Sequence, residues 1–129
     1  MPSFHDATTS SGPPEEVWKL LYDPARFPDW WAGVGTVEVA GAGGSYTMYP
    51  EGYPDVPMAQ MLETRRQEQR VTVSCLVSDL RFEWRLAPDG EGTLITVDVE
   101  IPEAEARRLD TQREVISESM RRLADLAAG

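Results

Sequence analysis

The chain has 129 residues, of which 41% are hydrophobic and 26% are charged, proportions that are typical of a soluble globular protein. Its formal net charge is -10, because 22 acidic residues outnumber 12 basic ones, and this surplus repels nucleic-acid phosphates and anionic lipid surfaces. We therefore expect one domain over residues 1–129, with no nucleic-acid partner and no insertion into a membrane.

The cysteine content and the amino terminus bear on the cellular compartment. Cys75 has no second cysteine to pair with, and its alternation with Val71, Val73 and Val77 predicts a buried, inert thiol. The first residues lack the basic and then apolar pattern of a secretory signal. We therefore expect a cytoplasmic protein, either a monomer or a homodimer formed through a sheet edge.

Two short helical segments follow a first strand that is expected over residues 4–9. Pro13 and Pro14 suit the first turn of a helix, where a missing N–H has no intrahelical partner. The helix has an apolar stripe at positions i, i+3 and i+4, formed by Val17, Leu20 and Leu21. Pro24 ends this helix, and a second short turn is expected over residues 25–31.

Six further strands are predicted after this turn, because alternating β-branched and aromatic residues stand there between turn signals. The predicted strands span residues 36–40, 45–49, 58–66, 70–77, 80–87 and 93–101. Residues 41–44 are predicted as a glycine-rich turn. Residues 50–57 are predicted as a surface loop, because proline cannot donate a hydrogen bond to a sheet.

The apolar alternation of the last two strands also predicts their register. For their apolar residues to share one face, opposed residues must have numbers of opposite parity, so the turn holds an even number of residues. Pro88 lacks the N–H that would close a two-residue turn, which favours a four-residue loop over 88–91. This loop predicts three opposed pairs, namely Trp84 with Ile95, Phe82 with Val97, and Arg81 with Asp98.

A long helix is expected at the end of the chain. Thr111 and Glu114 have the spacing of a capping box, so the helix is predicted from Gln112 to Ala127, a length of about 24 Å. Its apolar face consists of Ile116, Ser119, Met120, Leu123 and Ala127. Because only one side is apolar, this side must pack on the sheet. Residues 103–109 are predicted as a preceding turn or as part of the helix.

One set of residues spread along the chain has the pattern of a known family: Pro14-Glu-Glu-Val-Trp18, Leu20, Leu21, Asp23-Pro24, Phe27-Pro28, Trp30, Thr93 and Leu123. In this set and in its element order, the chain resembles the START-related helix-grip superfamily, which includes birch-pollen-allergen-like proteins and the SRPBCC proteins of the polyketide cyclase/dehydrase type. The resemblance implies an α+β fold, with a curved seven-stranded antiparallel sheet around a long C-terminal helix. It also implies two short helices between strands 1 and 2, and a cavity between the long helix and the sheet.

Three functions from different classes remain open. The first is binding of a hydrophobic small molecule, a lipid or an aromatic or polyketide-like compound, in the implied cavity. The second is an enzyme of the polyketide cyclase or dehydratase type that acts in that cavity. The third is a protein-interaction or growth-regulating module that uses the outer surface. No sequence motif indicates a cofactor, and the single histidine, His5, is expected to be free and to bind no metal.

Candidate site residues follow from residue type and from the strand patterns. Candidate ligand contacts are Trp30, Tyr46, Met48, Tyr49, Met61, Phe82, Trp84, Ile116 and Met120. The alternative for the tryptophans, Phe82 and the methionines is core packing, and the alternative for the strands that hold Tyr46, Tyr49 and residues 58–66 is an edge region exposed on both faces. Glu63 is the candidate catalytic acid or base of the cyclase hypothesis, if it is buried among apolar residues. The alternative for Glu63 is surface pairing with Arg65 or Arg81. The alternation over residues 58–66 leaves open which face of this strand is internal.

Overall fold

A seven-stranded antiparallel sheet frames the protein. The computed structural model describes residues 2–39 and 44–129, so residues 41–43 of the predicted turn at 41–44 lie outside the described part of the chain. The strand order is β1-β7-β6-β5-β4-β3-β2. The strands are β1 (Ser3–Ser10), β2 (Val34–Val39), β3 (Ser45–Pro50), β4 (Met58–Arg65), β5 (Arg70–Cys75), β6 (Arg81–Asp89) and β7 (Gly92–Glu100).

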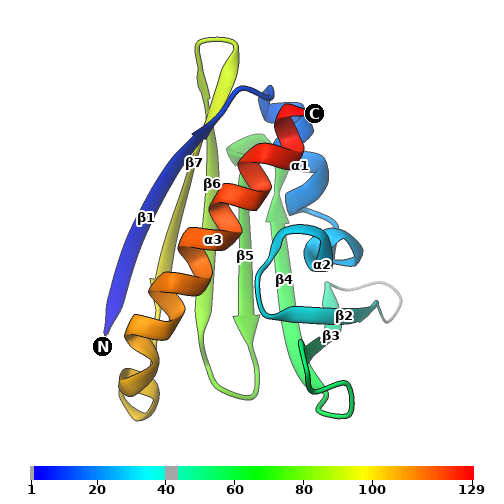
Figure 1. Cartoon of the computed structure of the whole chain (residues 1–129), viewed down its shortest axis with the longest axis vertical. Helices are drawn as coiled ribbons and strands as arrows, with labels where there is room; N and C mark the ends of the chain where they lie inside the picture. Colours follow the sequence, from blue (N-terminus) through cyan, green and yellow to red (C-terminus); the bar gives the residue numbers. More distant parts are fainter. Residues whose placement is uncertain (1, 40–43) are drawn as a thin grey trace.

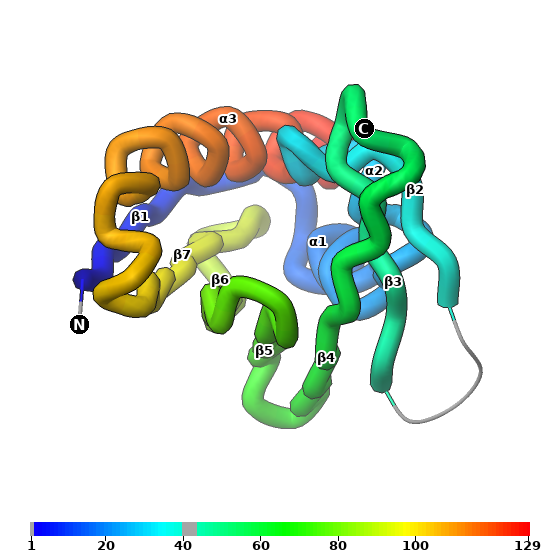
Figure 2. The backbone as a smooth tube through the Cα atoms, turned by 90° about the horizontal axis from the view of Figure 1, so that it is seen from below, coloured from blue at the N-terminus to red at the C-terminus, as the bar shows by residue number. Residues whose placement is uncertain are grey.

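Helices lie at one end of this sheet and across its concave face. The segments between β1 and β2 are α1 (Pro14–Leu21), η1 (Pro24–Arg26) and α2 (Phe27–Trp30), and the later ones are η2 (Arg66–Glu68), η3 (Glu103–Arg108) and α3 (Leu109–Ala128). Figure 1 shows α3 running diagonally over the strands towards α1. In Figure 2 the strands follow an arc from β1 to β2, and α3 lies across the open side of this arc. The predicted helix-grip fold is therefore confirmed.

The packing of the sheet follows the alternation of its residues. On β6, Phe82, Trp84 and Leu86 are buried, whereas Arg81 and Arg85 are exposed. Burial of one such large apolar side chain stabilises the fold by about 1.5–3 kcal/mol. The charged residues on the outer face form ion pairs, but exposed pairs contribute only about 0–1 kcal/mol each. The concave face therefore supplies most of the stability.

Buried aromatic rings fix α2 between the sheet and α3. The Trp30 ring makes edge-to-face contacts with Phe27 and Trp84, with centroid distances of 5.5 and 5.2 Å, and it stacks on Trp31 at 5.3 Å. The indole Nε1 of Trp30 donates a hydrogen bond of 2.9 Å to the carbonyl oxygen of Leu20. Edge-to-face and offset-stacked pairs stabilise beyond the area that they bury. This cluster therefore sets the position of the segment that follows α2.

Two buried serines tie α3 to the rest of the chain. The Ser119 hydroxyl accepts a hydrogen bond of 2.9 Å from the Ala32 N–H and donates one of 2.6 Å to the Val115 carbonyl. The Ser10 hydroxyl donates a hydrogen bond of 2.7 Å to the Ala124 carbonyl. Both hydroxyls satisfy buried backbone groups that would otherwise destabilise the fold. The position of α3 over the sheet is thereby fixed at two points.

The predicted parity of the β6–β7 hairpin is correct, but its predicted register is wrong by two residues. The observed pairs are Trp84 with Val97, Phe82 with Val99, Arg81 with Glu100, and Asp89 with Gly92. Only residues 90 and 91 remain in the turn, where Gly90 has a φ of 59° that suits a two-residue hairpin.

The reason for this register lies in the direction of one N–H. Leu86 donates its N–H to the carbonyl oxygen of Gln69, on the side of β6 away from β7. Pro88, two residues later, has its nitrogen on the same side, beyond the last residue that pairs with β5. Pro88 therefore costs the hairpin no hydrogen bond, and the argument for a longer loop fails.

The predicted capping box is also wrong. Helix α3 begins at Leu109, so Thr111 and Glu114 lie inside it rather than at its start. The preceding 3-10 helix η3 runs directly into α3, and Arg108 at the junction makes no side-chain cap. A helix that continues an existing turn needs no separate capping side chain to start it.

Candidate functional site

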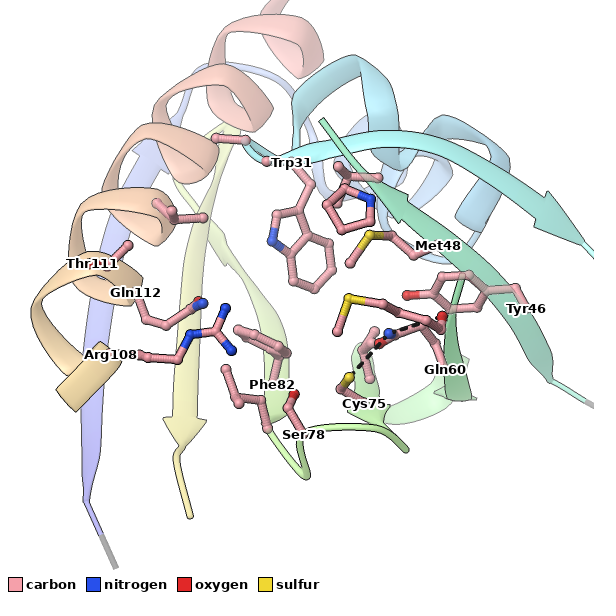
Figure 3. Close-up of a pocket in the computed structure, with 18 residues that line it drawn as sticks. Trp31, Tyr46, Met48, Gln60, Cys75, Ser78, Phe82, Arg108, Thr111 and Gln112 are labelled. Carbon is pink, nitrogen blue, oxygen red and sulfur yellow. Dashed lines mark hydrogen bonds between the residues drawn. The ribbon is translucent and has the colours of Figure 1, made fainter. Parts of the chain in front are cut away.

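A cavity of about 240 Å³ lies between the concave face of the sheet and the first turns of α3 (Figure 3). It is larger than the cavity of about 150 Å³ that accepts benzene in an engineered protein. It lies just below the range of about 300–1,000 Å³ for drug-sized ligands. Its volume therefore suits a molecule of one or two rings. The lining residues are Trp31, Ala32, Gly33, Val34, Tyr46, Met48, Pro50, Met58, Gln60, Val73, Cys75, Ser78, Leu80, Phe82, Arg108, Thr111, Gln112 and Val115.

Apolar side chains form most of the wall. The backbone leaves the helical conformation at Trp31, with φ −83° and ψ 107°, and the Trp31 ring lines the cavity while Trp30 stays in the core. Trp31 meets Phe82 edge to face at 5.0 Å between ring centroids. Met48 and Met58 complete this wall from β3 and β4, and their flexible thioethers adapt to different ligand shapes.

Tyr46, Gln60 and Cys75 lie side by side on three neighbouring strands. We call these three residues the polar row. Tyr46 is opposite Gln60 in the β3–β4 pair, and Gln60 is opposite Cys75 in the β4–β5 pair. Their exposed fractions are only 4%, 4% and 5%. The Gln60 Nε2 donates to the Met58 carbonyl and to the Cys75 Sγ, each at 3.3 Å (Figure 3). The polar row thus places three different hydrogen-bonding groups on one apolar wall.

The Tyr46 hydroxyl is directed into the cavity, and no hydrogen bond joins it to another described residue (Figure 3). Burial, and secondarily the negative charge that Cys75 can carry, raise the pKa of Tyr46. The hydroxyl therefore stays protonated at physiological pH and can donate a hydrogen bond. Because this hydroxyl lies on the cavity wall without a protein partner, it is free to donate a hydrogen bond to a ligand oxygen.

The environment of Cys75 favours its thiolate. Burial raises the pKa of the thiol, but hydrogen bonds from Ser78, from the Val77 backbone and from Gln60 outweigh it, so the pKa is lowered overall. The Sγ atom lies on the cavity wall. The sequence prediction of a buried thiol is therefore confirmed, and this thiol faces a cavity rather than packed core.

More exposed polar groups stand at the opposite side of the cavity. Arg108 and Gln112 reach it from η3 and α3, facing the polar row across the space (Figure 3). The Arg108 guanidinium lies 3.4 Å from the Glu105 carboxylate, with both groups partly in solvent. This exposed side is the mouth of the cavity, and it brings one cation to its rim.

The structure brings together three of the predicted ligand contacts: Tyr46, Met48 and Phe82 line the cavity. The other six do not line it. Trp30, Trp84 and Met120 are fully buried in the core, as their core-packing alternative had it, and so is Ile116. Tyr49 and Met61 lie on strand positions adjacent to inward residues and face outwards; Tyr49 donates its hydroxyl hydrogen to Glu38.

Glu63, the predicted catalytic acid or base, does not lie in the cavity. Its side chain is 57% exposed on the outer face of β4, where the Arg65 guanidinium lies 2.8 Å from its carboxylate. The buried carboxylate that the cyclase hypothesis requires at this position is therefore wrong, and the alternative of surface pairing with Arg65 is confirmed. On β4 the inward residues are Met58, Gln60 and Leu62, so the intervening positions, Glu63 among them, point to solvent.

Sequence reasoning missed Gln60, Cys75 and Trp31 as site residues. Gln60 is polar and inward, so apolar alternation gives no sign of it. Cys75 could have been found, because the alternation with Val71 and Val73 already placed it on the inner face of its strand. The position of the Trp31 side chain depends on the change of backbone conformation after α2, which residue type alone does not predict.

The expected free state of His5 is also wrong. His5 on β1 is directly opposite Asp98 on β7, and its Nδ1 lies 2.8 Å from the Asp98 carboxylate on the outer face. Within the described residues, no group of three or more His, Cys, Asp and Glu side chains could hold a metal ion. None of the described helices is long and apolar enough to cross a membrane.

The family described as polyketide cyclase/dehydrase and lipid transport matches residues 1–128. The chain belongs to this family. The match covers almost the whole chain and agrees with the helix-grip fold and the cavity between its helix and sheet. No curated protein matches the sequence of this chain.

Several solved structures share the fold of this chain, although their sequences are only distantly similar to it. A protein of Chromobacterium violaceum matches with a TM-score of 0.75 at 20% identity, over 100% of this chain and 99% of its own. The protein XoxI of Bacillus cereus matches with a TM-score of 0.77 at 17% identity, over 97% of this chain and 94% of its own. The di-domain ARO/CYC BexL of the BE-7585A biosynthetic pathway matches with a TM-score of 0.80 at 13% identity, over 97% of this chain and 46% of its own.

Proposed function

We propose that this protein binds a small hydrophobic molecule of one or two rings in the cavity between α3 and the sheet. The observation that carries the proposal is a hollow of about 240 Å³ with an apolar wall and a few convergent polar groups. The proposed ligand contacts are Trp31, Tyr46, Met48, Met58 and Phe82. The family description, which names lipid transport beside cyclase activity, supports a ligand-binding role.

The affinity that such a cavity can supply is moderate. A ligand of ten non-hydrogen atoms that gains about 0.5–0.8 kcal/mol per atom binds with a Kd of about 1–200 μM. One hydrogen bond to the Tyr46 hydroxyl selects ligands that carry an oxygen acceptor. We therefore expect aromatic phenols and ketones to bind better than hydrocarbons of equal size.

A cyclase or dehydratase role is the second candidate, supported by the family description and by the fold shared with ARO/CYC BexL. General acid–base catalysis of this kind most often uses a histidine or a carboxylate near the ligand. Among the described residues that line the cavity there is neither, and Tyr46 is held protonated. We therefore favour binding. Incubation with a poly-β-ketone tests the enzyme: a product distribution that the protein changes, and that Tyr46→Phe restores, would favour catalysis.

The size limit of the cavity gives the test of the binding proposal. In a calorimetric titration, 2-naphthol is expected to bind with 1:1 stoichiometry and a Kd in the range given above. Hydroxypyrene, a rigid four-ring compound, would have to fill the cavity of about 240 Å³ as densely as a protein interior is packed, so it is expected to displace packed side chains and to bind at least tenfold more weakly. Equal affinity for both compounds, or no measurable heat with 2-naphthol, would contradict the proposal.

A further inference from the structure

The cavity contains a nucleophile that reversible binding does not use. The Cys75 Sγ lies on its wall, where Gln60 Nε2 donates a hydrogen bond to it at 3.3 Å. Hydrogen-bond donors around a thiol favour the thiolate, which is the reactive form of cysteine. The adjacent turn adds Ser78 and the Val77 backbone to these donors. Cys75 thus has hydrogen-bond donors beside its sulfur and lies on the wall of the cavity.

A second and independent feature of the same cavity points to a ligand oxygen. Tyr46 is 4% exposed, and its hydroxyl, which no hydrogen bond joins to another described residue, is directed into the cavity (Figure 3). Tyr46 and Cys75 are separated only by Gln60 on the intervening strand, so their Cα atoms are about 10 Å apart. Their side chains project into the gap from the two ends of this row (Figure 3). A small ligand can therefore touch the hydroxyl with one end and the sulfur with the other.

We propose that Cys75 forms a covalent thioether with ligands that carry a carbon–carbon double bond conjugated to a carbonyl group. The Sγ atom bonds to the β-carbon, the π bond between the α- and β-carbons is lost, and the thiol proton ends on the α-carbon. The Tyr46 hydroxyl donates a hydrogen bond to the carbonyl oxygen, where negative charge develops during the addition. The reaction is an addition without a leaving group, so it requires no oxidant, reductant or further reactant.

The remaining residues define the class of ligand. Trp31, Phe82 and Met58 line the same cavity as these two groups, so the ligand is an apolar enone with one aromatic ring. The volume of about 240 Å³ suits ligands of this size. This inference rests on the proposed function, because the ligand must first enter the cavity. It replaces the sequence prediction of an inert thiol.

A pair of matched ligands separates the two proposals. Benzylideneacetone is an aromatic enone, and 4-phenylbutan-2-one is its saturated counterpart, with the same ring and carbonyl but no electrophilic carbon. Intact-protein mass spectrometry is expected to find one added benzylideneacetone per chain and no stable adduct of the saturated ketone. Peptide mapping is expected to place the adduct on Cys75, and Cys75→Ser is expected to abolish it while the protein still binds the saturated ketone in calorimetry.

Two further variants test the roles of the neighbours. Tyr46→Phe is expected to slow adduct formation by about 10- to 100-fold, the value of one hydrogen bond to a developing charge. Gln60→Leu removes a donor that lowers the pKa of Cys75, so the pH at which the rate reaches half of its maximum is expected to move upwards. Circular dichroism and urea denaturation of each variant check that the fold is kept.

The outcomes are distinct. Binding of the saturated ketone without any adduct of the enone would overturn the covalent proposal and leave the binding function standing. An adduct that forms no faster than with free glutathione, and at the same rate in Tyr46→Phe, would also overturn it. Failure of both ketones to bind would contradict the proposed function itself.

Discussion

Replacement of Trp30 by alanine is expected to lower the free energy of unfolding by about 3–5 kcal/mol, the typical cost of removing a large buried aromatic side chain. Trp30 is fully buried and contacts the rings of Phe27, Trp31 and Trp84. Its Nε1 also donates a hydrogen bond to the Leu20 carbonyl, which would lose this partner. The substitution therefore combines a cavity with an unsatisfied backbone group.

Urea denaturation of the variant and the parent protein measures this loss. Tyr53→Ala is the control, because Tyr53 is 64% exposed in the loop after β3 and its removal is expected to change stability by less than about 0.5 kcal/mol. A Trp30→Ala variant that loses less than about 1 kcal/mol would show that the aromatic cluster does not hold α2 in place.

Substitution of Val115 by tryptophan is expected to weaken binding of 2-naphthol at least tenfold. Val115 lies on α3, is half-buried and lines the cavity. An indole at this position would occupy the space that faces Phe82 and the polar row, so ligand and side chain would compete for one volume. The calorimetric titration described above measures the change in Kd.

The matched control for this variant is Leu126→Trp on the same helix. Leu126 is 44% exposed and is not among the residues that line the cavity, so its substitution is expected to leave the affinity unchanged. Equal affinities for the parent protein and Val115→Trp would place the bound ligand elsewhere. A loss of affinity in both variants would indicate a general effect of the added tryptophan.

The arrangement of the fold could be predicted from the sequence, because its elements follow from local patterns. The alternation of Phe82, Trp84 and Leu86 with charged residues specifies one buried face, and the structure has that face. The stripe of Ile116, Met120 and Leu123 likewise predicts a helix that packs on one side only. These patterns suffice for the order of the elements and for the side of each that is buried.

The details that failed depend on contacts that a local pattern does not contain. The β6–β7 register depends on where the Pro88 nitrogen points, and this is fixed by the end of β5 rather than by the hairpin itself. The start of α3 depends on η3, which supplies the preceding turn and makes a capping side chain at Thr111 unnecessary.

The candidate site was harder to predict than the fold, because its decisive residues break the apolar alternation. On β4 the inward positions hold Gln60 and Met58, and the outward ones hold Met61 and Glu63, so hydrophobicity does not separate the two faces. Only pairing of Gln60 with Cys75 on β5, whose inner face is clear, decides the orientation. Without this long-range constraint, the local pattern of β4 leaves open whether Glu63 lies in the cavity or pairs with an arginine on the surface.

Two-dimensional NMR of the ¹⁵N-labelled protein during a titration with 2-naphthol tests most directly whether the hollow under α3 is the binding site. The largest shifts are expected for the amides of Met48, Gln60, Cys75 and Val115 and for the indole N–H of Trp31, all of which belong to cavity-lining residues. The indole of Trp84, which lies in the core, is expected to move less. Shifts concentrated on the outer faces of β4 to β7, or none at the solubility limit of the ligand, would contradict a binding site beneath the helix.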